Sequence, residues 1–276
     1  MAVVLPATSR ESLAEAETRL DSRVDSASLV ELGVLGEQLF AVMRLLLTEM
    51  TLRRYLADSS VPAAHRTQLA DQVFARQLGR PALDTISDLV SARWSRPSDL
   101  VEAVEVLARR ATLGVAEKDG TLADVEDELF RFGRIVDRES QLATLLADTS
   151  APEDARVDLL NTVLGQKVRP VTKILLTQIV RAPRGRHLEW AAEELSELAA
   201  ARRDRYVAHI ATPVALTPRQ EQQLTASLSR LYGRPMSLQI EQDPSLLGGL
   251  VVRVGGEVID GSVSGRINAA RRSLPR

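Results

Sequence analysis

The chain has 276 residues, a formal net charge of −2 at pH 7 and no cysteine. The length allows two or three compact domains, and the near-neutral charge argues against a general nucleic-acid binder. The missing cysteine excludes disulfides, thiol catalysis and Cys-ligated metals, and an aromatic content of 3% makes a base-stacking surface unexpected.

The sequence contains no apolar run long enough to cross a bilayer. The strongest run, residues 39–47, is interrupted by Arg44 and fits a buried helix. The opening residues, MAVVLPATSRES, lack the basic segment that begins a secretory signal. We therefore expect a cytoplasmic protein whose link to any membrane runs through a partner.

The chain repeats itself. Residues 32–96 align without a gap with residues 122–186, at a constant offset of 90. The identical pairs include Leu39/Leu129, Phe40/Phe130, Asp58/Asp148, Pro62/Pro152 and Arg66/Arg156. A constant offset over this length indicates a duplication.

Each copy begins with an apolar stripe at helical spacing. The two stripes are Leu32, Leu35, Leu39, Val42 and Leu46, and Leu122, Val125, Leu129, Phe132 and Val136. This 3-4-3-4 spacing is typical of the core face of a helix in a bundle. A loop follows each stripe, and we expect Ser60 and Ser150 to N-cap the next helices, with Glu153 completing a capping box.

The remaining helices of the repeat follow from the same periodicity. They are predicted near residues 63–78, 80–94, 98–115, 153–165, 169–181 and 186–204. The helix near 98–115 closes the first bundle and opens the second, so the copies can share a helix instead of hanging on a flexible linker. The predicted bundles cover residues 1–110 and 111–204.

From residue 205 the apolar period changes to that of a small α+β domain, residues 205–276. Strands are predicted at 206–211, 236–240, 250–254 and 257–260. A helix starts at Thr217 as N-cap, with Pro218 in its first turn and Gln220 reaching back. Gly248 and Gly249 end a loop, and residues 255–256 form a Gly-Gly hairpin turn.

A closing amphipathic helix is indicated by the spacing of Val263, Ile267, Ala270 and Leu274. The domain therefore reads β-α-β-β-β-α. The fold class of the whole chain is mainly α, with two tandem related helical bundles followed by this small α+β C-terminal domain.

No catalytic, cofactor-binding or metal-binding constellation emerges from the sequence. The histidines, His65, His187 and His209, have no metal-ligand spacing, and no GK[ST] follows the glycines near 248–256. Those glycines are interpreted as turn residues, and Asp260 as a cap of the next helix or turn. We therefore predict a protein that is not an enzyme and that needs no cofactor or metal.

Apolar stripes on two helices are the candidate partner-binding residues. They are Leu100, Val104, Leu107 and Ala111 on the first, and Leu188, Ala191, Leu195 and Leu198 on the second. Core packing is the more common role for any one such residue, but helices that flank a bundle can also form a groove for an amphipathic helix. Trp94 and Trp190 fit either a core or an interface.

The C-terminal segment DPSLLGGLVVRVGGEVIDGSVSGRINAARRSL, residues 243–274, resembles the signature of the δ subunit of F-type ATP synthase, the oligomycin-sensitivity-conferring protein family. Its marker residues are Gly248, Gly249, Gly255, Gly256, Asp260 and Ser262. VAHIATPVALTPRQEQQL also resembles the strand and helix that open the family's C-terminal domain. The extra helical copy resembles the actinobacterial branch, in the form that is not fused to a membrane-anchored b subunit.

This resemblance implies a non-catalytic stator subunit at the cytoplasmic face of the cell membrane. Such a subunit binds the N-terminal helices of α subunits and joins them to b-type stalk helices, so that the catalytic head does not turn with the rotor. It implies a monomer within a hetero-oligomeric complex, with no cofactor. We expect the α helix on the second bundle, near Leu107 and Leu195, and the b-type helices on the first bundle and the C-terminal domain.

Two other classes stay open at this point. One is a free-standing helical adaptor that binds amphipathic helices of a different partner. The other is a nucleic-acid module, suggested by Arg266, Arg271, Arg272 and Arg276; the acidic balance and the scarce aromatics argue against it.

Overall fold

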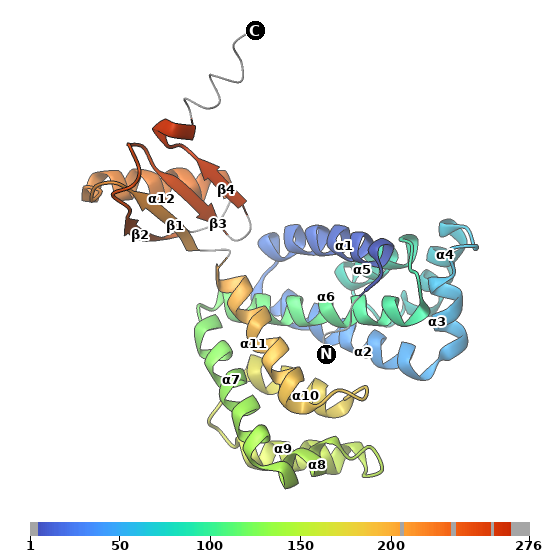
Figure 1. Cartoon of the computed structure of the whole chain (residues 1–276). Helices are drawn as coiled ribbons and strands as arrows, with labels where there is room; N and C mark the ends of the chain where they lie inside the picture. Colours follow the sequence, from blue (N-terminus) through green and yellow to red (C-terminus); the bar gives the residue numbers. More distant parts are fainter. Residues whose placement is uncertain (1–4, 205–206, 233–235, 255–256, 266–276) are drawn as a thin grey trace. The chain divides into compact units, whose positions relative to one another are not determined.

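The computed structural model describes residues 5–204, 207–232, 236–254 and 257–265. The chain divides into two compact units, Met1–Ala199 and Ala200–Arg276, which are described separately below. Helices dominate the first unit, and the second holds a small four-stranded sheet (Figure 1). The predicted fold class, mainly α with a small α+β C-terminal domain, is confirmed.

Unit 1 is built from helices around one continuous apolar core that extends from Ala16 to Ala199. The helices are α1 (Ala7–Ser26), α2 (Leu29–Thr48), α3 (Met50–Ala57), α4 (Ala63–Phe74), α5 (Arg80–Ser91), α6 (Pro97–Lys118), α7 (Leu122–Arg138), α8 (Ser140–Ala147), α9 (Glu153–Leu164), α10 (Pro170–Arg181) and α11 (Leu188–Asp204).

The sequence repeat is visible helix by helix. The helices α3, α4 and α5 begin and end 90 positions before α8, α9 and α10. The same offset carries α1 onto the range of α6, and α6 onto the range of α11. Each copy is thus a set of six helices, α1–α6 and α6–α11, and α6 is the last helix of one set and the first of the other.

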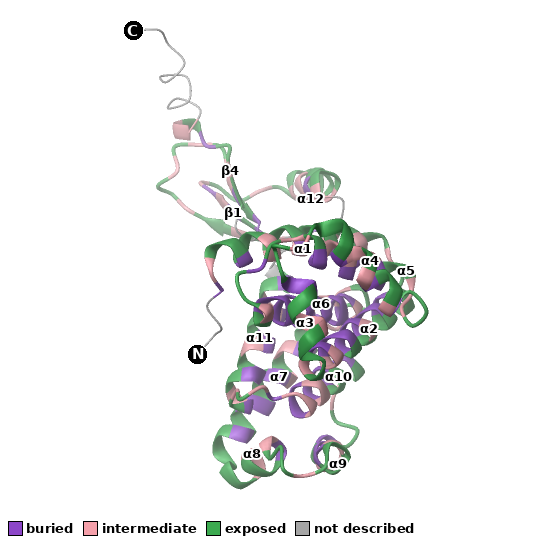
Figure 2. Ribbon diagram, turned by 90° about the vertical axis from the view of Figure 1, so that its right-hand side faces the viewer, coloured by how far each residue is buried: buried purple, intermediate pink, exposed green. Residues whose placement is uncertain are grey.

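The shared helix is buried on almost every face. Fifteen of the 22 residues of α6 are buried, and the helix contacts α1, α2, α3 and α5 as well as α7 and α10. Figure 2 shows the buried residues concentrated along α6 and the faces that meet it. The predicted boundary between residues 110 and 111 falls inside α6, so the division into two separate bundles stays a prediction.

The closest packing of α6 is against α2, where Gly36 faces Thr112. A Cβ at position 36 would overlap the Thr112 hydroxyl and would lie 3.3 Å from the Thr112 backbone nitrogen. Gly33, one turn earlier on the same helix, has open space where a Cβ would stand. One glycine of α2 therefore permits a helix contact, and the other faces away from it.

The expected N-caps of α4 and α9 are wrong. Pro62 and Pro152 occupy the cap positions. Ser60 and Ser150 instead donate backbone and hydroxyl hydrogen bonds to Asp58 and Asp148 two residues earlier, as Asx turns do. The predicted capping box at Glu153 is also wrong, because its carboxylate pairs with Arg181 at 3.1 Å.

Three helices, α1, α3 and α8, and the N-cap of α2 are present in the fold but are not predicted from the sequence. A complete capping box joins Ser28 and Glu31 at the start of α2, and α1 was not predicted. The short helices α3 and α8 lie mostly in segments for which no element is predicted, and non-helical backbone at Glu49 and Glu139 separates them from the preceding helices.

Unit 2 contains β1 (Val207–Thr212), α12 (Pro218–Tyr232), β2 (Ser237–Gln242), β3 (Val251–Val254) and β4 (Glu257–Asp260). The sheet order is β2-β1-β3-β4; β1 and β2 are parallel, and the other pairs are antiparallel. The helix start at Thr217 is confirmed, since the Thr217 hydroxyl accepts from the Gln220 amide and the Gln220 side chain accepts from the Thr217 amide.

The signature glycines and the residues after β4 form a compact corner. Gly248 and Gly249 have φ values of 148° and 79°, in the region that favours glycine, and the Gly248 carbonyl accepts from the Val263 amide at 2.9 Å. Asp260 accepts from the Ser262 amide, and the Ser262 hydroxyl accepts from the Gly265 amide. The predicted cap at Asp260 is therefore confirmed; the Gly255-Gly256 turn and most of the closing helix lie outside the described residues.

Two glycine variants on α2 separate close packing from helix propensity. We expect Gly36→Val to lower the free energy of unfolding of unit 1 by about 1–3 kcal/mol, because the new side chain overlaps α6. Gly33→Ala, in open space on the same helix, should raise it by up to about 1 kcal/mol. Urea denaturation followed by far-UV circular dichroism measures both. Equal effects of the two variants would contradict the packing described for Gly36.

Candidate partner-binding site

The structure places the eight predicted binding residues mainly inside unit 1. The buried members are Leu100, Val104, Leu107, Ala111, Leu188, Ala191 and Leu195. Leu198 is partly buried and packs against the same core. These side chains hold α6 and α11 in the bundle, and their direct contact with a partner stays a prediction.

The two tryptophans have different environments. Trp94 is buried, and its indole nitrogen donates to the Leu89 carbonyl at 2.7 Å, so it is a core residue. Trp190 is 51% exposed and stands edge-on to His187, with ring centroids 4.7 Å apart. Among the described residues, no group of three or more His, Asp or Glu side chains is arranged to hold a metal ion.

An apolar surface hollow of unit 1 lies between α2, α6 and α10 and measures about 660 Å³. Val30 and Val34 line the α2 side, Ile174 lines the α10 side, and Val115 of α6 belongs to the floor. Val30 is 76% exposed, Val34 45% and Ile174 43%. We call this hollow the α2–α10 groove.

Polar residues border the groove and fix its walls. Arg44 of α2 donates to the Gln178 side chain of α10 at 2.7 Å, which ties the two walls together. Glu37 on α2 and Lys173 on α10 are both exposed and line opposite sides. An apolar floor with charged borders suits the apolar face of an amphipathic helix.

Sequence reasoning missed this groove because its residues lie outside the two core stripes. Val30 and Val34 are spaced i, i+4, on a different face of α2 from Leu32, Leu35 and Leu39. That second apolar pair was a detectable signal. The groove also requires α2 to lie beside α10, about 140 positions later in the chain. This proximity depends on how the helices of the two copies pack together, and no local sequence pattern predicts it.

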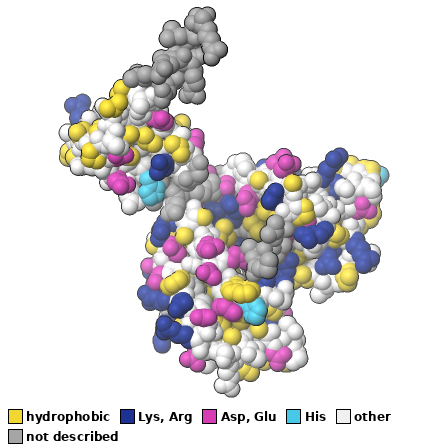
Figure 3. Space-filling model, in the orientation of Figure 1, with side chains coloured by type: hydrophobic (Ala, Val, Ile, Leu, Met, Phe, Trp, Pro, Cys, Tyr) yellow, Lys and Arg dark blue, Asp and Glu magenta, His cyan; other side chains and the backbone are white. Residues whose placement is uncertain are grey.

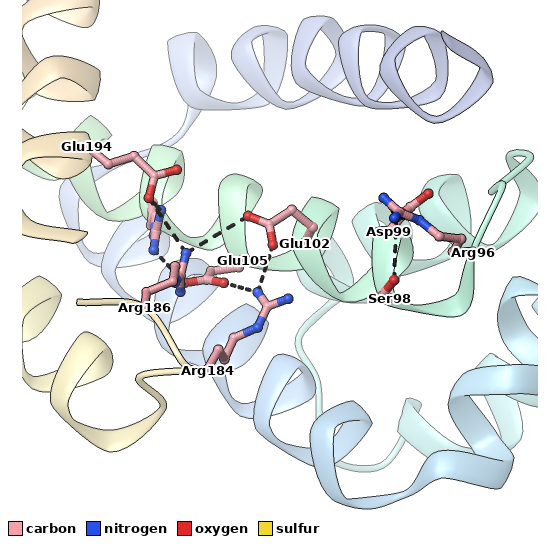
Figure 4. A network of polar contacts seen from close by, with 9 residues as sticks. Arg96, Ser98, Asp99, Glu102, Glu105, Arg184, Arg186 and Glu194 are labelled. Carbon is pink, nitrogen blue, oxygen red and sulfur yellow. Dashed lines mark hydrogen bonds and ion pairs between the residues drawn. The ribbon is translucent and has the colours of Figure 1, made fainter. Parts of the chain in front are cut away.

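Beside α10, a buried network of charges connects the α10–α11 loop to the shared helix (Figure 4). Glu105 of α6 pairs with Arg109 at 2.5 Å and with Arg184 and Arg186 of the loop. Glu102 pairs with Arg184 at 3.0 Å. Outside the loop, Arg109 reaches Glu194 of α11 at 3.2 Å.

The network balances its charges, which is the condition for burying ions. Burial by itself raises the pKa of Glu105, but the attraction of Arg109, Arg186 and Arg184 outweighs it, so that the pKa is lowered. Burial would lower the pKa of Arg186, but Glu105, Glu102 and Glu194 raise it. Glu105 and Arg186 are therefore both charged at neutral pH.

The equivalent joint of the first copy has a different set of contacts, in which Arg96 of the loop pairs with the buried Asp99 of α6 at 2.9 Å. The positions 90 before Glu102 and Arg184 hold Ser12 and Trp94. Ser12 donates to the Arg93 carbonyl at 2.8 Å, and Trp94 is buried. Glu15 and Arg19, which correspond to Glu105 and Arg109, form an exposed pair at 3.7 Å. The loop that precedes the sixth helix is thus joined to it by the Arg96–Asp99 ion pair in the first copy, whereas in the second copy the loop arginines pair with Glu102 and Glu105 of the shared helix.

Comparison with known proteins gives the family. The model of the family "ATP synthase delta (OSCP) subunit" matches residues 107–274, which begin within α6 and include the second helical copy and unit 2. ATP synthase subunit delta of Streptomyces avermitilis is 47% identical over 266 residues, 96% of this chain and 97% of that protein. The one of Frankia casuarinae is 44% identical over 272 residues, 97% and 99% of the two chains.

A fused relative also matches. ATP synthase subunit b-delta of Mycobacterium sp. strain KMS is 41% identical over 268 residues, which are 97% of this chain and 60% of that protein. Both helical copies and the α+β unit are thus shared with these relatives over nearly the full chain. The chain belongs to the ATP synthase delta (OSCP) subunit family.

The charge network predicts an acid-sensitive unit 1. Because the folded-state pKa of Glu105 lies below the unfolded one, its stabilisation is complete above about pH 5 and is lost as the pH falls through the lowered value. We expect Glu105→Gln to cost about 3–5 kcal/mol at pH 7, since it leaves buried arginines short of a partner. The free energy of unfolding, measured by chemical denaturation, should fall less between pH 7 and pH 4 for this variant than for the wild-type chain.

The matched control is Glu15→Gln, at the same repeat position but 71% exposed at the side chain. We expect it to change the free energy of unfolding by less than about 1 kcal/mol. A Glu105→Gln variant as stable as the control at pH 7 would show that the network is not a stabilising contact.

Proposed function

We propose that this chain is the delta subunit of an F-type ATP synthase and acts as a stator. It links the α subunits of the catalytic head to b-type stalk helices, which keeps the head from turning with the rotor. Its family membership supports this most directly, because relatives aligned over nearly the whole chain are named delta subunits. The role is mechanical and non-catalytic, so it needs extensive contacts and no active site.

The second helical copy is proposed to receive an N-terminal helix of an α subunit. The family model covers this copy and begins within α6. Within the copy, α6 and α10 border the α2–α10 groove, whose exposed Ile174 and part-buried Val115 provide apolar surface. This position replaces the predicted contact at Leu107 and Leu195, whose side chains are fully buried.

Unit 2 is proposed to contact the b-type stalk, together with the first helical copy. Its sheet buries one face in an apolar core that includes Leu228 of α12 and Val252. The opposite face is open, and Gln239, His209 and Arg253 lie side by side across it. A hollow of about 270 Å³ on this face is lined by these polar side chains, which suits the polar flank of a partner helix.

The proposal places the chain at the cytoplasmic face of the cell membrane, as a peripheral member of the complex and one copy within a hetero-oligomer. No helix among the described residues is long and apolar enough to cross a membrane. A free-standing helical adaptor is the competing function. On the face seen in Figure 3, basic and acidic side chains stand in several separate groups, which gives no support to nucleic-acid binding.

Co-purification distinguishes the stator from the adaptor. Tagged full-length chain, expressed in its own organism, should recover ATP synthase α and b-type subunits from detergent-solubilised membranes. Recovery of the chain in the soluble fraction without these subunits would contradict the stator role.

Ile174→Glu tests the groove on the second copy. We expect it to weaken binding of a synthetic peptide with the N-terminal sequence of the α subunit at least about tenfold, because a carboxylate would be buried against an apolar helix face. Isothermal titration calorimetry with the full chain measures this. Ile135→Glu, at a residue of similar exposure on α7 outside the groove, is the control.

The outcome that contradicts the groove is an equal affinity of the two variants and the wild-type chain. Substituting Leu107 and Leu195 by arginine would not serve as a test. Both side chains are fully buried, so loss of binding would follow from unfolding.

A further inference from the structure

We infer that the first helical copy contributes directly to binding the α-subunit helix, through the outer face of α2. This rests on the proposed function, in which that helix occupies the groove along α10. The structure assigns to α2 the opposite wall of the same groove. The duplicated copy is then part of the head contact as well as a spacer toward the stalk.

The outer face of α2 carries an apolar stripe that the core does not use. Val30, Gly33, Val34 and Glu37 are spaced i, i+3, i+4 and i+7, and all four are exposed and line the groove. Val30 and Val34, one turn apart, leave 76% and 45% of their surface exposed, so much of this apolar area is not used in packing within unit 1. Since Ile174 lies on the facing wall, an inserted helix would cover apolar side chains from both copies.

Gly33 gives the groove its width. It lies within α2, where glycine is unfavourable, and a Cβ there would meet no atom within 4 Å. Packing within the chain therefore does not explain it, in contrast to Gly36 on the core side. A residue without a side chain allows the backbone of an inserted helix to approach α2 closely.

The charges beside the groove indicate which flank of a bound helix faces each wall. Glu37 stands on the α2 wall, and Lys173 stands on the α10 wall. An amphipathic helix with basic residues on the flank toward α2 and acidic residues on the flank toward α10 matches both. A helix in this place bridges the two copies and stiffens their connection.

The equivalent helix pair of the first copy, α1 and α5, is joined by polar contacts. Between α1 and α5, Arg23 pairs with Asp88 at 2.5 Å and donates to Thr85 at 3.2 Å. The equivalent residues in the second copy, 90 positions later, are Leu113, Gln178 and Leu175. In the second copy Leu113 and Leu175 are buried, and Gln178 accepts a hydrogen bond from Arg44 of α2.

The test uses Gly33→Trp in the full-length chain and the synthetic α-subunit N-terminal peptide. The variant fills open space, so we expect an unchanged fold by circular dichroism and a melting temperature no lower than that of the wild-type chain. Calorimetry should give one peptide per wild-type chain and at least tenfold weaker binding for Gly33→Trp. Ala123→Trp, at the equivalent exposed position on α7, is the matched control and should bind as the wild-type chain does.

The outcomes separate this inference from the proposed function. In one outcome the wild-type chain and Gly33→Trp bind the peptide equally well, whereas Ile174→Glu binds it weakly. In that case α2 takes no part in binding and the inference is wrong, but the proposed site on the second copy is still supported. If the wild-type chain does not bind the peptide, the result contradicts both the inference about α2 and the proposed α-subunit site on the second copy. A chain that is dimeric by light scattering and becomes monomeric with Gly33→Trp would show that a second copy fills the groove, which also overturns the inference.

Discussion

Packing around α6 is the constraint on which the rest of unit 1 depends. This helix belongs to both copies of the duplicated sequence, and fifteen of its 22 residues are buried. Two six-helix sets that share one helix cannot be separated by a flexible linker, because each would lose a wall of its core. One continuous core results, reaching from α1 to α11. A rigid body of this kind would suit the stator role proposed above.

Sharing a helix also explains how the two copies diverged. Glu102 and Glu105 lie on a buried part of α6 and cannot reach water, so they need arginine partners. The same positions in α1 are Ser12 and Glu15, and Glu15 remains in solvent. The copies also differ on the surface beside their first and fifth helices. In the first copy, ion pairs with Asp88 join α1 to α5, whereas in the second copy the apolar α2–α10 groove lies beside α6 and α10.

Much of the fold could be predicted from the sequence, because it depends on local periodicity and a constant repeat offset. The ranges of most helices, the β-α-β-β-β order and the turn chemistry at Thr217 all follow from neighbouring residues, whereas α1, α3 and α8 do not. Ser60 and Ser150 misled the capping prediction, because their amides and hydroxyls donate to Asp58 and Asp148 and the cap positions fall two residues later. The groove could not be predicted, since it depends on where α2 meets α10. A core stripe and a binding stripe look alike until burial is known.

Native-state hydrogen exchange, read helix by helix in the full-length chain, tests the role of α6 most directly. If α6 joins the two copies into one core, its central amides exchange only through global opening of unit 1, with the same free energy as the most protected amides of α2 and α10. Exchange of the second-copy helices at a distinctly lower free energy than α2, with α6 following one copy alone, would contradict the account.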